Sequence, residues 1–169
     1  MLETPRLCLR PLEARDAEFI LELLNDPAFI ANIGDKGVRT REGALGYIET
    51  TAAKFAENGF GLLAVEDREG LVMGICGLVR REGLEGPDLG YAFLPRFWGQ
   101  GFAEEAARAI LDTCVLDRVL AVTDPANAPS IRLLGKLGFT PDGQVSLDGV
   151  GVSNRYVWLR GGTTAEVLK

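Results

Sequence analysis

The stretch RFWGQGFAEEA, Arg96 to Ala106, places two glycines directly before a helix-forming run. After them, alanine and aliphatic residues recur at intervals of three and four as far as Cys114, which predicts one apolar helix face. Before them, residues 87–94 (PDLGYAFL) read as a strand. The first N–H groups of a helix lack helical partners and carry partial positive charge. Gly99 and Gly101 would let a ligand approach this backbone, so the stretch predicts a phosphate cradle; a glycine-softened turn without ligand has the same pattern.

Two other phosphate-binding patterns do not fit this stretch. A dinucleotide fingerprint needs a third glycine where this chain has Glu104, and a larger side chain there would prevent close packing of the helix on the strand. A nucleotide P-loop needs a Gly-Lys-Ser/Thr run, which the sequence lacks.

The rest of the chain predicts an α/β domain around that strand–helix junction. Strands are expected at residues 6–12, 60–67, 71–80, 87–94 and 118–124, with two more around Asp148-Gly149. A helix capped by Asp16 is expected to stop near Asn25-Asp26-Pro27, with a loop at 33–37 after it. Further helices are expected after a Thr40 cap, ending at Asn58-Gly59, over 102–114, and over 130–139, ending at Gly138. The order βααβββαβαββ predicts a mixed sheet of about seven strands flanked by about four helices, in one domain over residues 1–169. The unit 87–124 predicts a parallel crossover, and such sheets bind ligands at the carboxyl ends of their strands.

Composition narrows the possible functions. The chain has no histidine, which excludes Ser-His and Cys-His catalysis and histidine-ligated metal sites, and no metal is expected. A net charge of −6 argues against nucleic acid as a partner. No apolar run approaches a membrane span and no signal peptide is recognisable, so we expect a cytoplasmic protein that does not bind membranes. Cys8, Cys76 and Cys114 are scattered, and we expect buried, inert thiols.

The glycine stretch resembles the Arg/Gln-x-x-Gly-x-Gly/Ala acetyl-CoA-binding motif of the GCN5-related N-acetyltransferases (GNAT), with Arg96, Gly99 and Gly101 at its defining positions. The longer Trp-Gly-x-Gly-aromatic-Ala-x-Glu-Ala run is similar to the RimJ/RimL-like ribosomal-protein alanine acetyltransferase branch. TPRLCLRPLEARD, DLGYAFLP and NAPSIRLLGKLGF (127–139) are similar to further segments of that branch. The resemblance covers nearly the whole chain and implies a GNAT fold with acetyl-CoA as co-substrate, held by residues 93–106 and 127–139.

The resemblance also implies which residues hold acetyl-CoA. Main chain around Phe93 and Leu94 is expected to hydrogen-bond the pantetheine like an added strand. Asn127 is expected to contact the pantetheine or merely to cap the following helix. Arg96 is expected to add charge near the phosphates, although a solvated surface arginine is the alternative. The diphosphate is expected on the backbone N–H groups of Trp98, Gly99, Gln100, Gly101, Phe102 and Ala103.

In the family, a primary amine attacks the thioester directly, so side chains must take a proton from the ammonium and give one to the leaving thiolate. Ser130 matches the serine of the branch and is the expected donor, but helix capping explains it equally well. Many members carry a tyrosine four residues later, where this chain has Leu134. Asp88 matches a carboxylate of many members and is the expected base; since it follows Pro87 in an exposed-looking turn, a solvated aspartate is an equal alternative.

The resemblance implies an acceptor site between residues 29–38 and 146–154, and Tyr91 is expected to line its channel or to pack in the core. Asp35 and Asp148 could attract a cationic amine or serve only as turn residues. Three functions remain open: acetyl transfer to a primary amine such as a protein N-terminus, acyl transfer to a small-molecule amine, or a catalytically decayed acyl-CoA-binding module. Homodimers are common in the resembling branch, so a homodimer is a further expectation.

Overall fold

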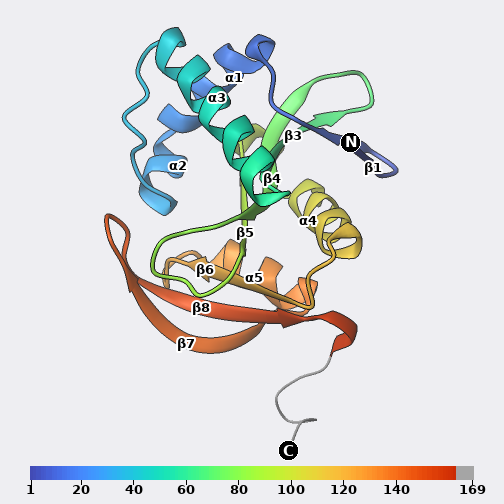
Figure 1. Ribbon diagram of the computed structural model, residues 1–169, viewed down its shortest axis with the longest axis vertical. Coiled ribbons are helices and arrows are strands. Elements are labelled where there is room, and N and C mark those ends of the chain that lie inside the picture. The colour runs from blue at the N-terminus through green and yellow to red at the C-terminus, as the bar shows by residue number, and fades with distance from the viewer. Residues whose placement is uncertain (163–169) are drawn as a thin grey trace, which may run out of the picture.

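The computed structural model describes residues 1–162, and one mixed sheet runs through the molecule (Figure 1). The strand order is β1-β2-β3-β4-β5-β6-β8-β7. The strands are β1 (Leu2–Glu3), β2 (Leu7–Arg10), β3 (Leu62–Asp67), β4 (Val72–Val79), β5 (Asp88–Phe93), β6 (Arg118–Thr123), β7 (Thr140–Leu147) and β8 (Gly151–Leu159). The helices are α1 (Ala17–Asn25), α2 (Pro27–Asn32), α3 (Arg41–Asn58), α4 (Phe102–Thr113) and α5 (Ala128–Leu137). The predicted α/β class and element order are confirmed, with β1 and α2 as additions.

The sheet splits between β5 and β6. These two strands are parallel, as the crossover predicted, but they are paired only at Asp88 and Leu120. Further along β5, the N–H of Leu94 donates to the carbonyl of Met73 on β4 at 3.1 Å. Because main-chain groups alternate in direction along a strand, those of Phe93 point the other way, into the gap toward β6. The gap therefore presents β5 main chain that no strand covers.

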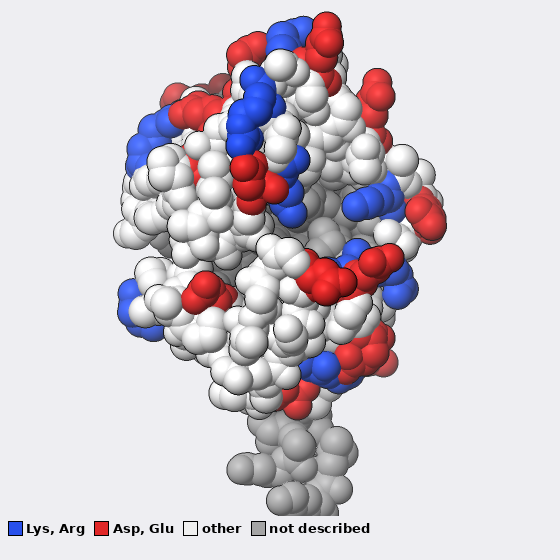
Figure 2. Space-filling model, turned by 90° about the vertical axis from the view of Figure 1, so that its left-hand side faces the viewer, with Lys and Arg blue, Asp and Glu red and all other residues white. Residues whose placement is uncertain are grey.

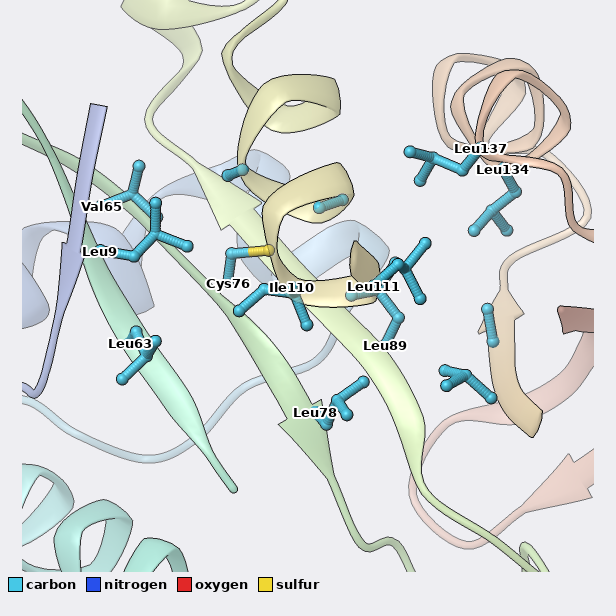
Figure 3. Close-up of a cluster of buried hydrophobic side chains, with 14 of the residues drawn as sticks. Leu9, Leu63, Val65, Cys76, Leu78, Leu89, Ile110, Leu111, Leu134 and Leu137 are labelled. Carbon is cyan, nitrogen blue, oxygen red and sulfur yellow. The ribbon is translucent and has the colours of Figure 1, made fainter. Parts of the chain in front are cut away.

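Two apolar clusters lie on the two faces of the sheet. On one face α4 and α5 cover the strands, and Figure 3 shows Cys76 and Leu89 directed toward Ile110 and Leu111 of α4. On the other face α1, α2 and α3 pack over Ala64 and Ile75. Alternation along the strands sends successive side chains to opposite clusters, which explains why the short strand-like runs are apolar on both sides.

The cysteine expectation holds for one of the three thiols. Cys76 is buried, and burial raises its pKa to about 12. Cys8 and Cys114 are only partly buried, which corrects the expectation of three buried thiols. No helix within residues 1–162 is long and apolar enough to cross a membrane.

Two helix starts differ from the sequence prediction. Asp16 precedes α1 but does not cap it with its side chain. Its carboxylate instead accepts two hydrogen bonds from the buried Arg10 guanidinium, at 2.8 and 2.9 Å, and one from the Glu13 N–H. Burial would raise the pKa of Asp16, but these hydrogen bonds outweigh it and hold the pKa below its usual range. A buried ion pair thus replaced the expected cap.

The second difference is α2, a helix that was not predicted between the end of α1 and the loop at 33–37. Asp26 accepts a hydrogen bond from the Ala28 N–H at 2.9 Å, and Pro27 is the first helical residue. The Asn25-Asp26-Pro27 run that ends α1 therefore also begins α2, since Asp is a good cap and Pro fits the first turn. Thr40 caps α3, and Gly59 and Gly138 end α3 and α5 in the left-handed conformation, as predicted.

Candidate active site

A cleft of about 1740 Å³ opens where β5 separates from β6. It runs from the glycine loop and α5, past the end of β5, to α3 and the β7–β8 turn. The sequence-predicted residues that line it are Phe93, Trp98, Gly99, Gly101, Phe102, Ala103, Asn127 and Ser130. Those that do not line it are Asp88, Leu94, Arg96 and Gln100. The structure therefore brings together most of the residues expected to bind the cofactor; it leaves out three of them, Leu94, Arg96 and Gln100, and also the expected base, Asp88.

The glycine loop has the geometry of an anion cradle. Gly99 and Gly101 have φ values of 74° and 81°, in the left-handed region that favours glycine. A Cβ built on Gly99 would meet no atom within 4 Å, so open space lies above its backbone. Gly101 precedes the first residue of α4 and offers no capping side chain. The N–H groups of the first turn of α4 are thus available to an anionic ligand at the positive end of the helix.

Arg6 supports the glycine loop, although sequence analysis did not identify it. Its Nη1 donates to the carbonyl of Gln100 at 2.9 Å, and its Nε pairs with Oε1 of Glu105 at 2.7 Å. Its guanidinium lies 4.4 Å from the ring centroid of Phe102. A Cβ built on Gly101 would come within 3.3 Å of Arg6 Nη2, which places a cation beside the loop. Arg6 and Glu105 are 99 positions apart, so no local pattern could have shown their pairing.

Arg96 points away from the expected phosphate site. Its Nη1 pairs with Oε1 of Glu22 on α1 at 2.6 Å, and its guanidinium stacks on Phe97. Gln100 lies beneath the loop, with its Nε2 donating to the carbonyl of Arg96. Hence Gln100 closes the glycine loop and Arg96 joins it to α1. The positive charge beside Gly101 is that of Arg6.

The end of β5 is also held in place. The main-chain N–H of Leu94 is already bonded to Met73, so only the Phe93 part of the expected pantetheine contact faces the gap. The indole Nε1 of Trp98 donates to the carbonyl of Phe93 at 2.8 Å. Trp98 therefore ties the glycine loop to the end of β5, and the Phe93 N–H remains directed into the gap.

Two hydroxyl groups meet in the cleft. The Tyr91 hydroxyl on β5 and the Ser130 hydroxyl on α5 are 2.6 Å apart and share a hydrogen bond. Asn127, not Ser130, is the N-cap of α5, because its Oδ1 accepts from the Ser130 N–H at 3.3 Å. The Ser130 hydroxyl is therefore free for the contact with Tyr91. Burial raises the pKa of Tyr91 to about 12, with the bond to Ser130 opposing the shift, so the phenol keeps its proton at neutral pH.

Leu134 lies in the buried core, one helical turn after Ser130. No phenol can therefore come from the position where many family members carry a tyrosine. Tyr91 brings a phenol to Ser130 from the neighbouring strand instead. From the sequence, Tyr91 was expected either to line the acceptor channel or to pack in the core; in the structure it lies on the cleft wall and packs against the core behind it.

Asp88 is the clearest departure from the sequence prediction. The expected exposed turn is wrong: Asp88 is the first residue of β5 and is 0% exposed, because β4 and β6 flank it. Its Oδ2 accepts from Nη2 of Arg81 at 3.1 Å, and its Oδ1 has no hydrogen-bond partner. Burial raises the pKa of Asp88 to about 6, and the charge of Arg81 opposes this shift. Arg81 lines the cleft while Asp88 lies behind it.

Of the two aspartates expected near the acceptor, only one lies in the cleft. Asp35 does not line it; its carboxylate pairs with Arg39 at 2.6 Å and accepts from the Gly37 N–H. Asp148 does line the cleft, at the β7–β8 turn. Asp35 thus has the turn role that was its alternative.

Comparison with known proteins identifies the family of the chain. The acetyltransferase (GNAT) domain family matches residues 6–140. YkkB of Bacillus subtilis (strain 168), named as an uncharacterized protein, is 36% identical over 150 residues, covering 81% of this chain and 83% of YkkB. The uncharacterized N-acetyltransferase p20 of Bacillus licheniformis is 30% identical over 150 residues, covering 84% and 83%.

A solved structure extends the likeness to the whole fold. RimL, a ribosomal L7/L12 alpha-N-protein acetyltransferase in complex with coenzyme A, superposes with a TM-score of 0.81 at 15% identity, over 95% of this chain and 97% of RimL. At this identity the likeness shows the shared fold. Because the family match runs from the start of β2 to the start of β7, and both relatives align over most of their length, the chain belongs to the GNAT acetyltransferase family and is an acyltransferase enzyme.

Proposed function

We propose that this protein transfers an acetyl group from acetyl-CoA to a primary amine. The observation that carries the proposal is the Tyr91–Ser130 hydroxyl pair, which lies in the same cleft as the glycine loop and the uncovered end of β5. A binding module has no need of a partly buried, protonated hydroxyl pair. We further propose that the acceptor is of the RimJ/RimL type, which is the N-terminal amine of a protein, and that the enzyme works in the cytoplasm.

The residues of the cleft fit acetyl-CoA. The N–H groups of the first turn of α4 and the left-handed Gly99 and Gly101 would hold the diphosphate, with the Arg6 guanidinium beside them. The main chain of Phe93 would pair with the extended pantetheine in the gap between β5 and β6. Bound acetyl-CoA would supply a thioester whose carbonyl carbon takes the amine nitrogen as its C–S bond breaks.

The hydroxyl pair would then move one proton to the departing sulfur. Ser130 Oγ donates its proton to the thiolate, Tyr91 Oη returns a proton to Ser130 through the 2.6 Å hydrogen bond, and the Tyr91 phenolate regains a proton from water in the cleft. Because the pKa of Tyr91 is raised to about 12, the pair is protonated before each turnover. The chain thus supplies an acid without histidine.

The ammonium proton of the acceptor would leave to water in the cleft. Asp88 does not touch the cleft, so we assign it the holding of Arg81 at the cleft wall. The Asp88→Asn variant separates this role from that of a general base. If Asp88 were the base, the acid limb of the kcat/KM profile would be lost in the variant, whereas an unchanged limb would rule out that role and agree with the holding of Arg81.

Steady-state kinetics with acetyl-CoA and a panel of primary amines, followed by release of free thiol, tests the function. We expect Ser130→Ala to lower kcat about 10²-fold with little change in the Kd of acetyl-CoA, and Tyr91→Phe to lower kcat by a smaller factor. Tyr156→Phe is the matched control, because Tyr156 is a buried phenol outside the cleft. A wild-type protein that binds acetyl-CoA but acetylates no peptide N-terminus or small amine would instead be the binding module.

A further inference from the structure

Basic residues that form ion pairs and basic residues that form none lie in different parts of the structure. Most arginines within residues 1–162 lie within 4.0 Å of a carboxylate. The described basic residues that form no ion pair are Lys36, Lys54, Arg80, Arg132 and Lys136. Every one of them lines the cleft. Although the chain has 24 acidic and 18 basic residues, the lysine and arginine side chains of residues 1–162 that lack an ion pair thus all lie along one cleft.

These cations fall on two sides of the cleft. Arg132 and Lys136 are four residues apart on α5, the helix that carries Ser130, so they belong to the cofactor side. Lys36 comes from the loop between α2 and α3, Lys54 from α3, and Arg80 from the end of β4. These three lie on the acceptor side of the cleft, and with Arg81 they form what we call the basic pocket.

In the basic pocket, the charges of Arg81 and Lys54 act on Lys36. The pKa of Lys36 lies below its usual value, first because of partial burial and then because of the charges of Arg81 and Lys54. Arg81 has one carboxylate partner, the buried Asp88 behind it. Two carboxylates, Glu82 and Asp148, also line this side, but neither lies within 4.0 Å of a basic group. Like charges held together in a cleft repel, and a bound anion would relieve the repulsion.

Figure 2 views the molecule from the side of α2 and the β7–β8 turn, where the acceptor side of the cleft opens. Basic side chains reach the central hollow from above and from the right, and acidic side chains lie along its lower edge and beside the basic ones above it. The helical spacing of Tyr47, Thr51 and Lys54 turns one polar stripe of α3 toward the cleft, while Ala44 and Ile48 pack into the core. The polar stripe is therefore part of the cleft wall.

We propose that the amine acceptor carries an anionic group, a carboxylate or a phosphate, which binds in the basic pocket of Lys36, Lys54, Arg80 and Arg81. This inference rests on the proposed acetyl transfer and names the acceptor class of that same cleft. The anion would be held at the acceptor side while the amine lies toward Tyr91 at the end of β5. Two sources share this chemistry: a small amine with its own acidic group, and a protein N-terminus followed by acidic side chains.

The first test compares matched acceptors that differ by one anionic group. The pairs are O-phosphoethanolamine with ethanolamine, glycine with glycinamide, and a peptide starting Ala-Asp-Asp with one starting Ala-Asn-Asn. We expect kcat/KM to favour the anionic member of at least one pair on the order of tenfold, and Lys36→Gln/Lys54→Gln to remove that preference. Arg15→Gln/Arg41→Gln removes the same charge outside the cleft and should keep it. The favoured pair identifies the source.

A second readout does not need turnover. Lysine labelling with acetic anhydride, read by mass spectrometry, should show protection of Lys36 and Lys54, but not of Lys136, by 10 mM of the anionic member of a pair and not by its neutral partner. If Lys36 and Lys54 are protected but the enzyme acetylates no amine from acetyl-CoA, the result would support the basic pocket and refute the proposed function. Equal kcat/KM for both members of every pair, a preference retained in Lys36→Gln/Lys54→Gln, or no protection would overturn the inference.

Discussion

The buried carboxyl of Asp88 predicts a pH dependence of stability that can be measured against one isosteric variant. Its pKa is raised from 3.8 to about 6, chiefly by burial, with Arg81 opposing the shift. Between these two values the folded protein binds the proton more tightly than the unfolded chain. The contribution of Asp88 to the free energy of unfolding is therefore largest at low pH and is lost as pH rises through 6. Between pH 5 and pH 7 this loss is about 1.3 kcal/mol.

Asp88→Asn removes the titration and keeps an oxygen for Arg81. Urea unfolding of wild type and variant at pH 5, 6 and 7, at constant ionic strength, gives the difference in free energy of unfolding. The variant should gain about 1.3 kcal/mol relative to wild type from pH 5 to pH 7. Low protein concentration is advisable, because pH 5 is close to the sequence pI of 4.8. Asp112→Asn removes one exposed carboxylate and is the matched control.

The outcome of this comparison decides whether Asp88 is buried as described. A difference between wild type and Asp88→Asn that stays constant within about 0.3 kcal/mol from pH 5 to pH 7 would show that the carboxyl titrates alike in both states. A wild type that gains stability relative to the variant as pH rises would show that the ion pair with Arg81 outweighs burial. Either result would refute the reasoning.

Three further predictions concern the glycine loop. Gly101→Val should cost about 1–2 kcal/mol of stability through its left-handed backbone and should weaken acetyl-CoA binding in calorimetry, whereas Gly70→Val, with φ of 89° in a distant turn, should cost stability alone. Arg6→Gln should weaken acetyl-CoA binding several-fold and Arg96→Gln should not; the reverse order would place the phosphates nearer Arg96. Acetyl-CoA at 100 times its Kd should raise Tm on the order of 5–10 °C, with NAD as a control that gives no shift.

Local features of the chain were predictable because short-range geometry decides them. The conformations of Gly99 and Gly101, the Thr40 cap and the glycine ends of two helices depend on a few neighbouring residues. The periodic apolar residues of α4 and the alternation in β5 indicated the faces that the core covers. The Asn25-Asp26-Pro27 run shows the limit, because a helix end and a helix start use overlapping signals.

Side-chain partners and burial depended on contacts between distant segments. Arg6 reaches Glu105 across 99 positions, and Tyr91 reaches Ser130 across 39. Packing also reversed an expectation: neighbouring strands bury Asp88, which local sequence placed in an exposed turn.

The sequence by itself therefore determined the element order, the glycine loop and the resemblance to the GNAT family, because backbone dihedrals and apolar periodicity are encoded over a few residues. Only the tertiary structure decided which cation lies beside the loop, which hydroxyl meets Ser130, and that Lys36, Lys54 and Arg80 share one cleft. The physical reason is that the direction, burial and charge environment of a side chain follow from the segments packed around it, and those segments come from every part of the chain.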